Sequence, residues 1–285
     1  MRILITGLGG FTGYYLKQEL ESQGHCVQGL KADLTNSEEV AKEIAELKPE
    51  AVAHLGGISY VDNRNVSAFY QVNLIGTQNL LVALYENASD VRSILLSSSA
   101  IVYGNQSKDL INEEITPIPT SDYAVSKLAM EQMASLWMER LPLFIVRPFN
   151  YTGIGQKKQF LIPKIVSHFL GKKTILELGY LDVWREFGDV RVVVEIYRKL
   201  LDLCPRGKTL NVCTGQKYSL KEVVLLCETI TGHSIEVREN PEFVRSNEVL
   251  VLRGSNSLLN KVIGPWKPYQ LEETLMWMLG EGDDS

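Results

Sequence analysis

The stretch RILITGLGGFTG, residues 2–13, decides the fold of this 285-residue chain. A short apolar run, Ile3 to Ile5, leads directly into a loop in which Gly7, Gly10 and Gly13 follow a GxxGxxG spacing. Glycines at this spacing allow a tight turn and let a pyrophosphate approach the backbone, at the positive end of the helix that follows. Glycine-rich loops also serve as plain turns. The position after an N-terminal strand favours a dinucleotide site.

Outward from this loop, short β-rich runs alternate with helical patterns. The expected strands are residues 3–5, a strand beginning at 25–27, 51–55, 93–97 and 143–146, and the expected helices are 14–22, 38–47, 67–87 and 121–140. Such alternation is typical of βαβ units, whose parallel sheet is covered on both faces. We therefore predict an α/β fold with a Rossmann-like, doubly wound parallel sheet over residues 1–150.

The rhythm changes after Pro148, where glycine-containing loops separate the helical runs. These runs are residues 162–170, 189–203 and 219–231, with a late strand at 209–213. Residues 151–285 are expected to form mainly a smaller C-terminal substrate-binding domain that completes a cleft. We expect segment 189–215 to belong also to the first, NAD(P)-binding domain.

The composition is that of an ordinary globular protein, with 45% hydrophobic and 22% charged residues and a formal net charge of −5. This balance argues against an electrostatic nucleic-acid binder. No apolar run reaches the ~18 residues of a membrane span, and the chain opens on a strand pattern where a signal peptide would carry charged and apolar regions. The four cysteines show no CxxC pairing, so we expect reduced, buried thiols and a cytoplasmic location. The four histidines are scattered, which gives no support to a metal site.

Tyr123 and Lys127 lie four residues apart in YAVSK, and hence on one face of a helix. A free tyrosine is a poor acid or base at neutral pH, and a nearby lysine cation favours the phenolate. Residues Ser97 to Ser99 end a predicted buried strand at the edge where α/β sheets bind ligands, and Asn73 adds a polar group on the preceding helix. Each of these residues alone has a structural explanation, such as a strand cap or a helix contact. Together with the glycine loop they predict a catalytic site.

The residues that select the cofactor follow the second strand. Lys31 is suited to contact a 2′-phosphate, which favours NADP(H) over NAD(H), although it is equally well explained as a solvated lysine. Asp33 is suited to contact ribose or adenine. Both cofactors stay open at this point.

The chain resembles the extended short-chain dehydrogenases/reductases of the nucleotide-sugar type. The matching motifs run along most of its length: TGLGGFTG (6–13), DL (33–34), HLGG (54–57), VN (72–73) with GT (76–77), SSSAIVYG (97–104), YAVSK (123–127) and RPFN (147–150). Further motifs resemble the GDP-4-keto-6-deoxy-D-mannose reductases, which form GDP-D-rhamnose. They are RPFNYTGIGQ (147–156), Phe160 with IP (162–163), REFGDV (185–190), LNVCTG (210–215) and Arg245 ahead of GS (254–255).

The resemblance implies a role for each matching residue. The catalytic set is Ser99, Tyr123 and Lys127. The cofactor-binding set is Gly7, Gly10, Phe11, Gly13, Lys31, Asp33, Leu34, Leu55, Gly56, Asn73, Ser97, Tyr123, Lys127 and Pro148. The substrate-binding set is Ser99, Asn150, Phe160, Arg185, Asn211 and Arg245, with the arginines reaching the diphosphate.

The sequence also departs from the reductase pattern, and these departures bear on which sugar and nucleotide the cleft accepts. Asp122 stands where a proline usually precedes the tyrosine, Tyr151 ends the FNH motif, Ile154 lies in the GPGQ motif, and Glu186 replaces the aspartate of RDF. The aspartate usual after DVR is Val192.

The resemblance implies reduction of a nucleotide-linked 4-keto-6-deoxy sugar, with no metal, no nucleic acid and no membrane. A nucleotide-sugar 4-epimerase with tightly held NAD is the nearest alternative, and a non-catalytic dinucleotide-binding sensor is a remote one. Dehydration is disfavoured, because Ala100 and Ile101 follow Ser99 where dehydratases carry acidic residues. A homodimer is expected, because helices 67–87 and 121–140 correspond to those that form a four-helix interface in relatives.

Overall fold

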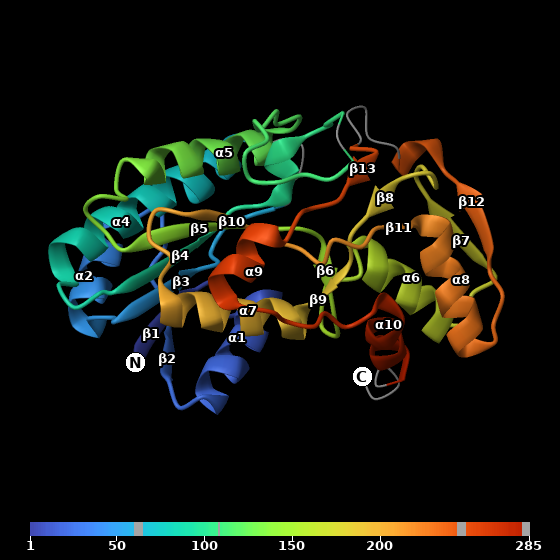
Figure 1. Ribbon diagram of the computed structural model, residues 1–285, viewed down its shortest axis with the longest axis horizontal. Helices are drawn as coiled ribbons and strands as arrows, with labels where there is room; N and C mark the ends of the chain where they lie inside the picture. The colour runs from blue at the N-terminus through green and yellow to red at the C-terminus, as the bar shows by residue number, and fades with distance from the viewer. Residues whose placement is uncertain (60–64, 108, 244–248, 281–285) are drawn as a thin grey trace.

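Six parallel strands form the central sheet of the protein (Figure 1). The computed structural model describes residues 1–59, 65–107, 109–243 and 249–280. In spatial order the strands are β10 (Thr209–Val212), β5 (Leu143–Pro148), β4 (Ser93–Ser97), β3 (Ala51–His54), β1 (Arg2–Thr6) and β2 (Cys26–Gly29). The order reverses between β1 and β3, because the chain first adds β2 on one side and then extends the sheet on the other. In such sheets, ligands bind outside the carboxyl ends of the strands at this reversal.

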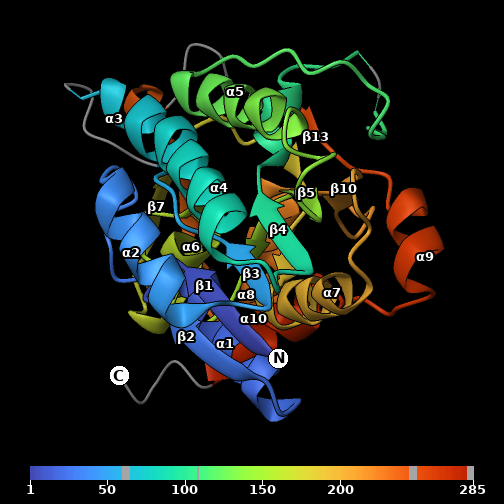
Figure 2. The same ribbon diagram turned by 90° about the vertical axis from the view of Figure 1, so that its left-hand side faces the viewer.

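Helices cover both faces of this sheet (Figure 2). Successive strand side chains point to opposite faces, so Ile3 and Ile5 pack in one layer and Leu4 in the other. The first layer is covered by α1 (Phe11–Ser22), α7 (Val190–Leu203) and α9 (Ser257–Ile263). The second is covered by α2 (Ser37–Leu47), α4 (Gly76–Asn87) and α5 (Asp122–Ser135). Because both faces are buried, the strands are nearly continuous apolar runs.

Small sheets and three further helices make up the right-hand part of the molecule in Figure 1. Their core is a separate cluster that includes Ile165, Phe169, Val223 and Leu275. The paired strands are β6 (Tyr151–Thr152) with β9 (Gly188–Asp189), β7 (Ile175–Leu178) with β12 (Glu236–Glu239), and β8 (Trp184–Arg185) with both β11 (Tyr218–Ser219) and β13 (Val251–Leu252). The helices are α6 (Leu161–Leu170), α8 (Leu220–Thr231) and α10 (Leu271–Gly280).

The doubly wound α/β fold expected from the sequence is confirmed, and two helix predictions need correction. The helix expected to reach Arg140 ends at Ser135, because the next residues form tighter i to i+3 turns before Pro142, which disfavours helix at the preceding residue. The single helix expected over 67–87 is composite: α3 (Ser67–Phe69), a π-helical turn η1 (Tyr70–Ile75) and α4. The division of the chain near residue 150 stays a prediction.

The cysteine prediction is wrong for part of the set. Cys213 and Cys227 are buried as expected, whereas Cys26 is exposed and Cys204 is only partly buried. Cys26 lies on β2, which is the edge strand of the sheet and has a side open to solvent. Within the described residues, no helix combines the length and the apolarity needed to cross a membrane.

Candidate active site

The loop between β1 and α1 is a cradle that side chains would fill. Gly7 has a left-handed φ of 74°, and a Cβ added at Gly13 would lie 2.4 Å from the carbonyl oxygen of Gly7. The N-cap residue Gly10 has no side chain, and the first turn of α1 carries no acidic residue. The first amides of α1 are therefore open to an anion at the positive end of the helix. These residues fit a dinucleotide pyrophosphate.

The opposite side of this cradle is the turn that follows β3. A Cβ on Gly7 would lie 2.9 Å from the amide nitrogen of Gly56, so the two turns touch at the reversal of strand order. Leu55 is partly buried there, and a Cβ on Gly56 would lie 3.0 Å from Leu34 Cδ1. The structure thus brings together the predicted cofactor residues Gly7, Leu34, Leu55 and Gly56.

Lys31 and Asp33 lie beyond the end of β2, and both side chains are exposed. The amide of Lys31 donates to the carboxylate of Glu43 at 2.9 Å. The Asp33 carboxylate accepts hydrogen bonds from the amide and the hydroxyl of Thr35 at 2.9 and 2.8 Å. The hydrogen bond from the Thr35 amide lowers the pKa of Asp33. Asp33 is thus committed to a local turn, whereas Lys31 has its ammonium at the surface.

Tyr123 lies in the first turn of α5, which Ser121 caps by accepting from the amide of Ala124 at 3.3 Å. Burial raises the pKa of Tyr123 to about 12, and a side-chain hydrogen bond with Ser99 opposes this rise. The sequence predicts a tyrosine whose lysine neighbour favours the phenolate. In the structure desolvation outweighs any such effect, so Tyr123 is a protonated phenol at neutral pH.

Lys127 follows one turn later and is 7% exposed. Its Nζ donates to the carbonyl oxygen of Ser97 at 2.7 Å, at the carboxyl end of β4. Burial lowers the pKa of Lys127 to about 8, while the Glu131 carboxylate raises it. Lys127 is therefore largely cationic at neutral pH.

Asn73 occupies the π-helical turn η1, where its side chain is fully used. Its Oδ1 accepts from the amide of Ile58 at 2.9 Å, and its Nδ2 donates to Ile58 O at 3.0 Å and to Ser126 Oγ at 3.1 Å. A Cβ added at Gly57 would lie 2.9 Å from Asn73 Oδ1 and 3.4 Å from Lys127 Nζ. Asn73 and Lys127 therefore face the same glycine at the edge of the cofactor cradle.

Phe11 and Pro148 are the remaining predicted cofactor residues. Phe11 opens α1 and stacks on Tyr151 with ring centroids 6.2 Å apart. The Tyr151 hydroxyl is 2.7 Å from Thr12 Oγ1. Pro148 ends β5 and is buried. Tyr151, which replaces the histidine of the reductase motif, thus braces the start of α1.

The predicted substrate residues that the structure describes lie on separate elements. Asn150 is exposed, and Phe160 is 39% exposed at the N-cap of α6. Arg185 is 7% exposed in β8, with Nη1 donating to Trp184 O at 3.0 Å. Asn211 is fully buried, and its side chain bonds to Tyr103 and Ile111, so we no longer assign it to the substrate-contacting set. Arg245 lies outside the described residues.

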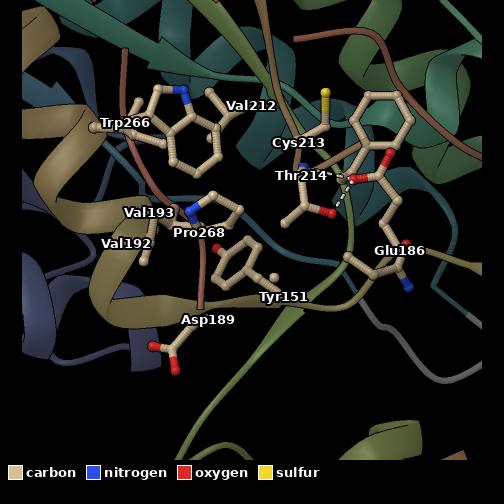
Figure 3. Close-up of a pocket in the computed structure, with 14 residues that line it drawn as sticks. Tyr151, Glu186, Asp189, Val192, Val193, Val212, Cys213, Thr214, Trp266 and Pro268 are labelled. Carbon is tan, nitrogen blue, oxygen red and sulfur yellow. Dashed lines mark hydrogen bonds between the residues drawn. The ribbon is translucent and has the colours of Figure 1, made fainter. Parts of the chain in front are cut away.

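A pocket beside the N-terminus of α7 adjoins this region (Figure 3). Tyr151, Glu186, Thr214 and Trp266 are among its lining residues, whereas Ser99, Tyr123 and Lys127 are not. Glu186 is 1% exposed and accepts from Thr214 N at 2.7 Å and from the amides of Gly215 and Gly254. The Glu186 carboxylate therefore links its own loop to the loops at Thr214 and Gly254 by hydrogen bonds. Glu186 is also the residue that replaces the aspartate of the RDF motif of the reductases.

The sequence did not predict two buried polar clusters. Arg147 in β5 pairs with Glu131 in α5, and His54 in β3 bonds to Thr6 and Thr77. The available signal was a polar residue inside an otherwise apolar strand, in LFIVRP for Arg147 and in AVAH for His54. Such residues need partners when buried, but the sequence does not identify those partners.

Comparisons with known proteins agree with this geometry. The profile of the NAD dependent epimerase/dehydratase family matches residues 3–213. A GDP-6-deoxy-D-talose 4-dehydrogenase from Aggregatibacter actinomycetemcomitans is 37% identical, covering 93% of this chain and 92% of the relative. A GDP-6-deoxy-D-mannose reductase from Pseudomonas aeruginosa is 35% identical, covering 94% of this chain and 92% of the relative. The solved structure of RMD from Pseudomonas aeruginosa complexed with NADPH has a TM-score of 0.88 at 33% identity, covering 98% and 96% of the two chains.

Proposed function

This chain belongs to the NAD dependent epimerase/dehydratase family, and from that membership we propose that it is a nucleotide-sugar 4-ketoreductase. The proposed reaction reduces GDP-4-keto-6-deoxy-D-mannose to GDP-D-rhamnose with NADPH or NADH. The observation that carries the proposal is the placement of the Tyr123 phenol and the Lys127 cation one turn apart on α5, with Ser99 beside Tyr123. Two relatives that are 37% and 35% identical to this chain are named for GDP-6-deoxy sugars.

We assign the cofactor to the cradle formed by the Gly7 turn and the adjoining Gly56 turn. The open amides of α1 would hold its pyrophosphate, and Lys127 would hold its nicotinamide ribose. When bound, the reduced nicotinamide supplies the hydride to C4 of the sugar. The exposed ammonium of Lys31 favours NADPH, because it offers a cation to a 2′-phosphate near the end of β2.

We assign the proton transfer to Tyr123. Reduction of a ketone leaves an alkoxide that needs a proton, and a phenol with a pKa of about 12 carries that proton throughout the neutral range. Ser99, which lies beside Tyr123, would donate to the same developing oxyanion. The Lys127 cation then stabilises the phenolate left behind.

The stereochemistry at C4 separates two products. Talose and mannose differ only at C4, so reduction of the same 4-keto sugar from opposite faces gives GDP-6-deoxy-D-talose or GDP-D-rhamnose. The 37% identical dehydrogenase named for the talose sugar makes that product the second candidate. A UDP-glucose 4-epimerase from Halalkalibacterium halodurans, 28% identical over 97% of this chain, keeps redox-neutral 4-epimerisation as the alternative.

The test is to incubate the purified protein with GDP-4-keto-6-deoxy-D-mannose and either NADPH or NADH, and to follow loss of reduced nicotinamide. We expect stoichiometric consumption, and NMR of the product assigns the C4 configuration. Interconversion of nucleotide sugars with no net cofactor consumption would instead establish an epimerase. Tyr123→Phe should lose most turnover while still binding NADPH, because only the transferable proton is removed. Full activity of this variant would refute the assignment.

We also propose that the protein is a homodimer joined through α4 and α5. These helices expose large apolar side chains, among them Tyr85 at 54% and Val125 at 39%, and Leu136, just beyond α5, is 75% exposed. Light scattering of the wild type and of Leu136→Lys tests this, since a charge at the interface should give monomers.

A further inference from the structure

A chain of buried hydrogen bonds connects the turn after β3 to η1. Thr6 Oγ1 accepts from the amide of Gly56 at 2.8 Å and lies 2.7 Å from His54 Nδ1. His54 Nε2 lies 2.8 Å from Thr77 Oγ1, which donates to the carbonyl oxygen of Asn73 at 2.7 Å. The side chains of Thr6, His54, Asn73 and Thr77 are each 1% exposed.

The direction of these bonds follows from their last member. The carbonyl oxygen of Asn73 can only accept, so the single hydroxyl hydrogen of Thr77 is used there. Thr77 Oγ1 must then accept from His54, which places a hydrogen on Nε2. With Nε2 protonated, a neutral His54 has a bare Nδ1 that accepts from the hydroxyl of Thr6. One arrangement therefore satisfies every atom: Gly56 N–H to Thr6, Thr6 O–H to His54, His54 Nε2–H to Thr77, and Thr77 O–H to Asn73.

The surroundings of His54 keep its ring neutral. Burial, with a smaller contribution from the Lys127 cation, lowers the pKa of His54 to about 3. A second proton on the imidazole would place a hydrogen on Nδ1, where Thr6 donates, and a cation close to Lys127. The chain is thus a fixed brace at neutral pH, and it changes no protonation state during turnover.

The two ends of the brace touch different parts of the proposed site. At one end, Gly56 contacts the Gly7 turn of the cofactor cradle. At the other end, η1 carries Asn73, which faces Gly57 together with Lys127. A π-helical turn has weaker intrinsic stability than an α-helix, so a hydrogen bond to its backbone at Asn73 O has a clear positioning value.

We propose that His54 is a positioning residue that joins the nucleotide-binding turn at Gly56 to the Asn73 turn beside Lys127, with one ring nitrogen serving each side. The effect on turnover rests on the proposed function, whereas the effect on cofactor binding does not. The Thr6 side governs NADPH affinity, and the Thr77 side governs the rate at saturating NADPH.

The test separates the two sides with near-isosteric variants. Thr6→Val should weaken NADPH binding about tenfold, the equivalent of ~1.4 kcal/mol, with little change in kcat. Thr77→Val should lower kcat about tenfold with little change in NADPH affinity. His54→Gln, whose amide superimposes on Nε2, should behave like Thr6→Val, and His54→Asn, whose amide superimposes on Nδ1, should behave like Thr77→Val.

Thr274→Val is the matched control, because Thr274 is also fully buried and donates to Asp189 at 2.9 Å, away from the brace. It should lose stability while keeping wild-type NADPH affinity and kcat. NADPH affinity is measured by fluorescence titration without any sugar. A wild-type protein without reductase activity would therefore refute the proposed function, while the predicted effects on NADPH affinity could still be tested. ¹⁵N NMR of His54 should show the Nε2–H tautomer with no titration between pH 5 and 8.

Two results would overturn the proposal. One is an Nδ1–H tautomer or a neutral-range titration of His54. The other is a set of variants whose NADPH affinity and kcat fall together in proportion to their melting temperatures, which would make His54 a stability residue alone.

Discussion

Replacing Glu131 with glutamine is expected to destabilise the protein by about 3–5 kcal/mol, the range for breaking a buried ion pair from one side. Arg147 and Glu131 are 6% and 4% exposed. Arg147 Nε donates to Glu131 Oε1 at 2.9 Å, and Nη2 donates to Oε2 at 2.5 Å. Glutamine keeps one acceptor but presents an NH₂ group to a guanidinium, so a buried cation loses its counter-charge.

The remaining contacts of Arg147 place the cost near the lower end of that range. Its Nη1 still donates to the hydroxyl of Tyr103 at 2.9 Å, and its Cζ lies 4.8 Å from the centroid of the Tyr103 ring. These contacts do not neutralise the charge, so we expect about 3 kcal/mol for Glu131→Gln. The double variant Glu131→Leu/Arg147→Met removes both charges and should recover most of the loss, since apolar replacement of a buried pair is often neutral.

The assay is urea denaturation followed by circular dichroism, with the slope of the transition checked against wild type. Asp182→Asn is the control, because Asp182 pairs with Lys221 on the surface at 87% and 64% side-chain exposure and should show no measurable loss. A Glu131→Gln loss below about 1 kcal/mol, or a double variant no more stable than the single one, would refute the reasoning. Glu131→Gln should also shift the fall of activity at alkaline pH to lower pH, because the Glu131 carboxylate raises the pKa of Lys127 in the wild type.

Three further outcomes are expected. Gly13→Ala should abolish NADPH binding in a fluorescence titration, because its Cβ would lie 2.4 Å from a backbone oxygen, whereas Gly9→Ala, with open space around it, should bind normally. The pH–rate profile at saturating NADPH should be flat near neutrality and fall as pH rises through about 8, where Lys127 loses its proton while Tyr123 keeps its own; a fall on the acid side alone would contradict the assignment. Ser219→Ala removes the capping box of α8 and should cost about 1 kcal/mol in denaturant melts without changing kcat.

The sheet could be predicted from the sequence because each strand of its interior is an apolar run between glycines, turns and helices. Ile3 to Ile5 and Leu143 to Val146 are of this kind. The helix ends were harder. Nothing in the periodicity of 121–140 marks Ser135 as the last helical residue, and a π-helical turn at 70–75 has no sequence signature distinct from that of an α-helix. Both depend on what the backbone packs against.

The catalytic candidates were visible because Tyr123 and Lys127 share a helix face, which is a local property. Long-range partners were not visible. Asn211 matches a substrate motif by position, but its side chain is bound to Tyr103, 108 residues away. The protonated state of Tyr123 likewise depends on desolvation by the folded chain, which spacing alone cannot measure.

The order in which the sheet is completed has a consequence for synthesis. The outer strand β10 and the covering helix α7 come from residues 190–212, after α6 and β7 have been made. A nascent chain that ends after β5 therefore shows Ile5, Phe144 and their neighbours to solvent on the face that α7 will cover. At ribosomal rates of about 5–20 residues per second, this apolar face stays exposed for on the order of several seconds before α7 has been synthesised. We expect this half-covered intermediate to be the species that general chaperones bind.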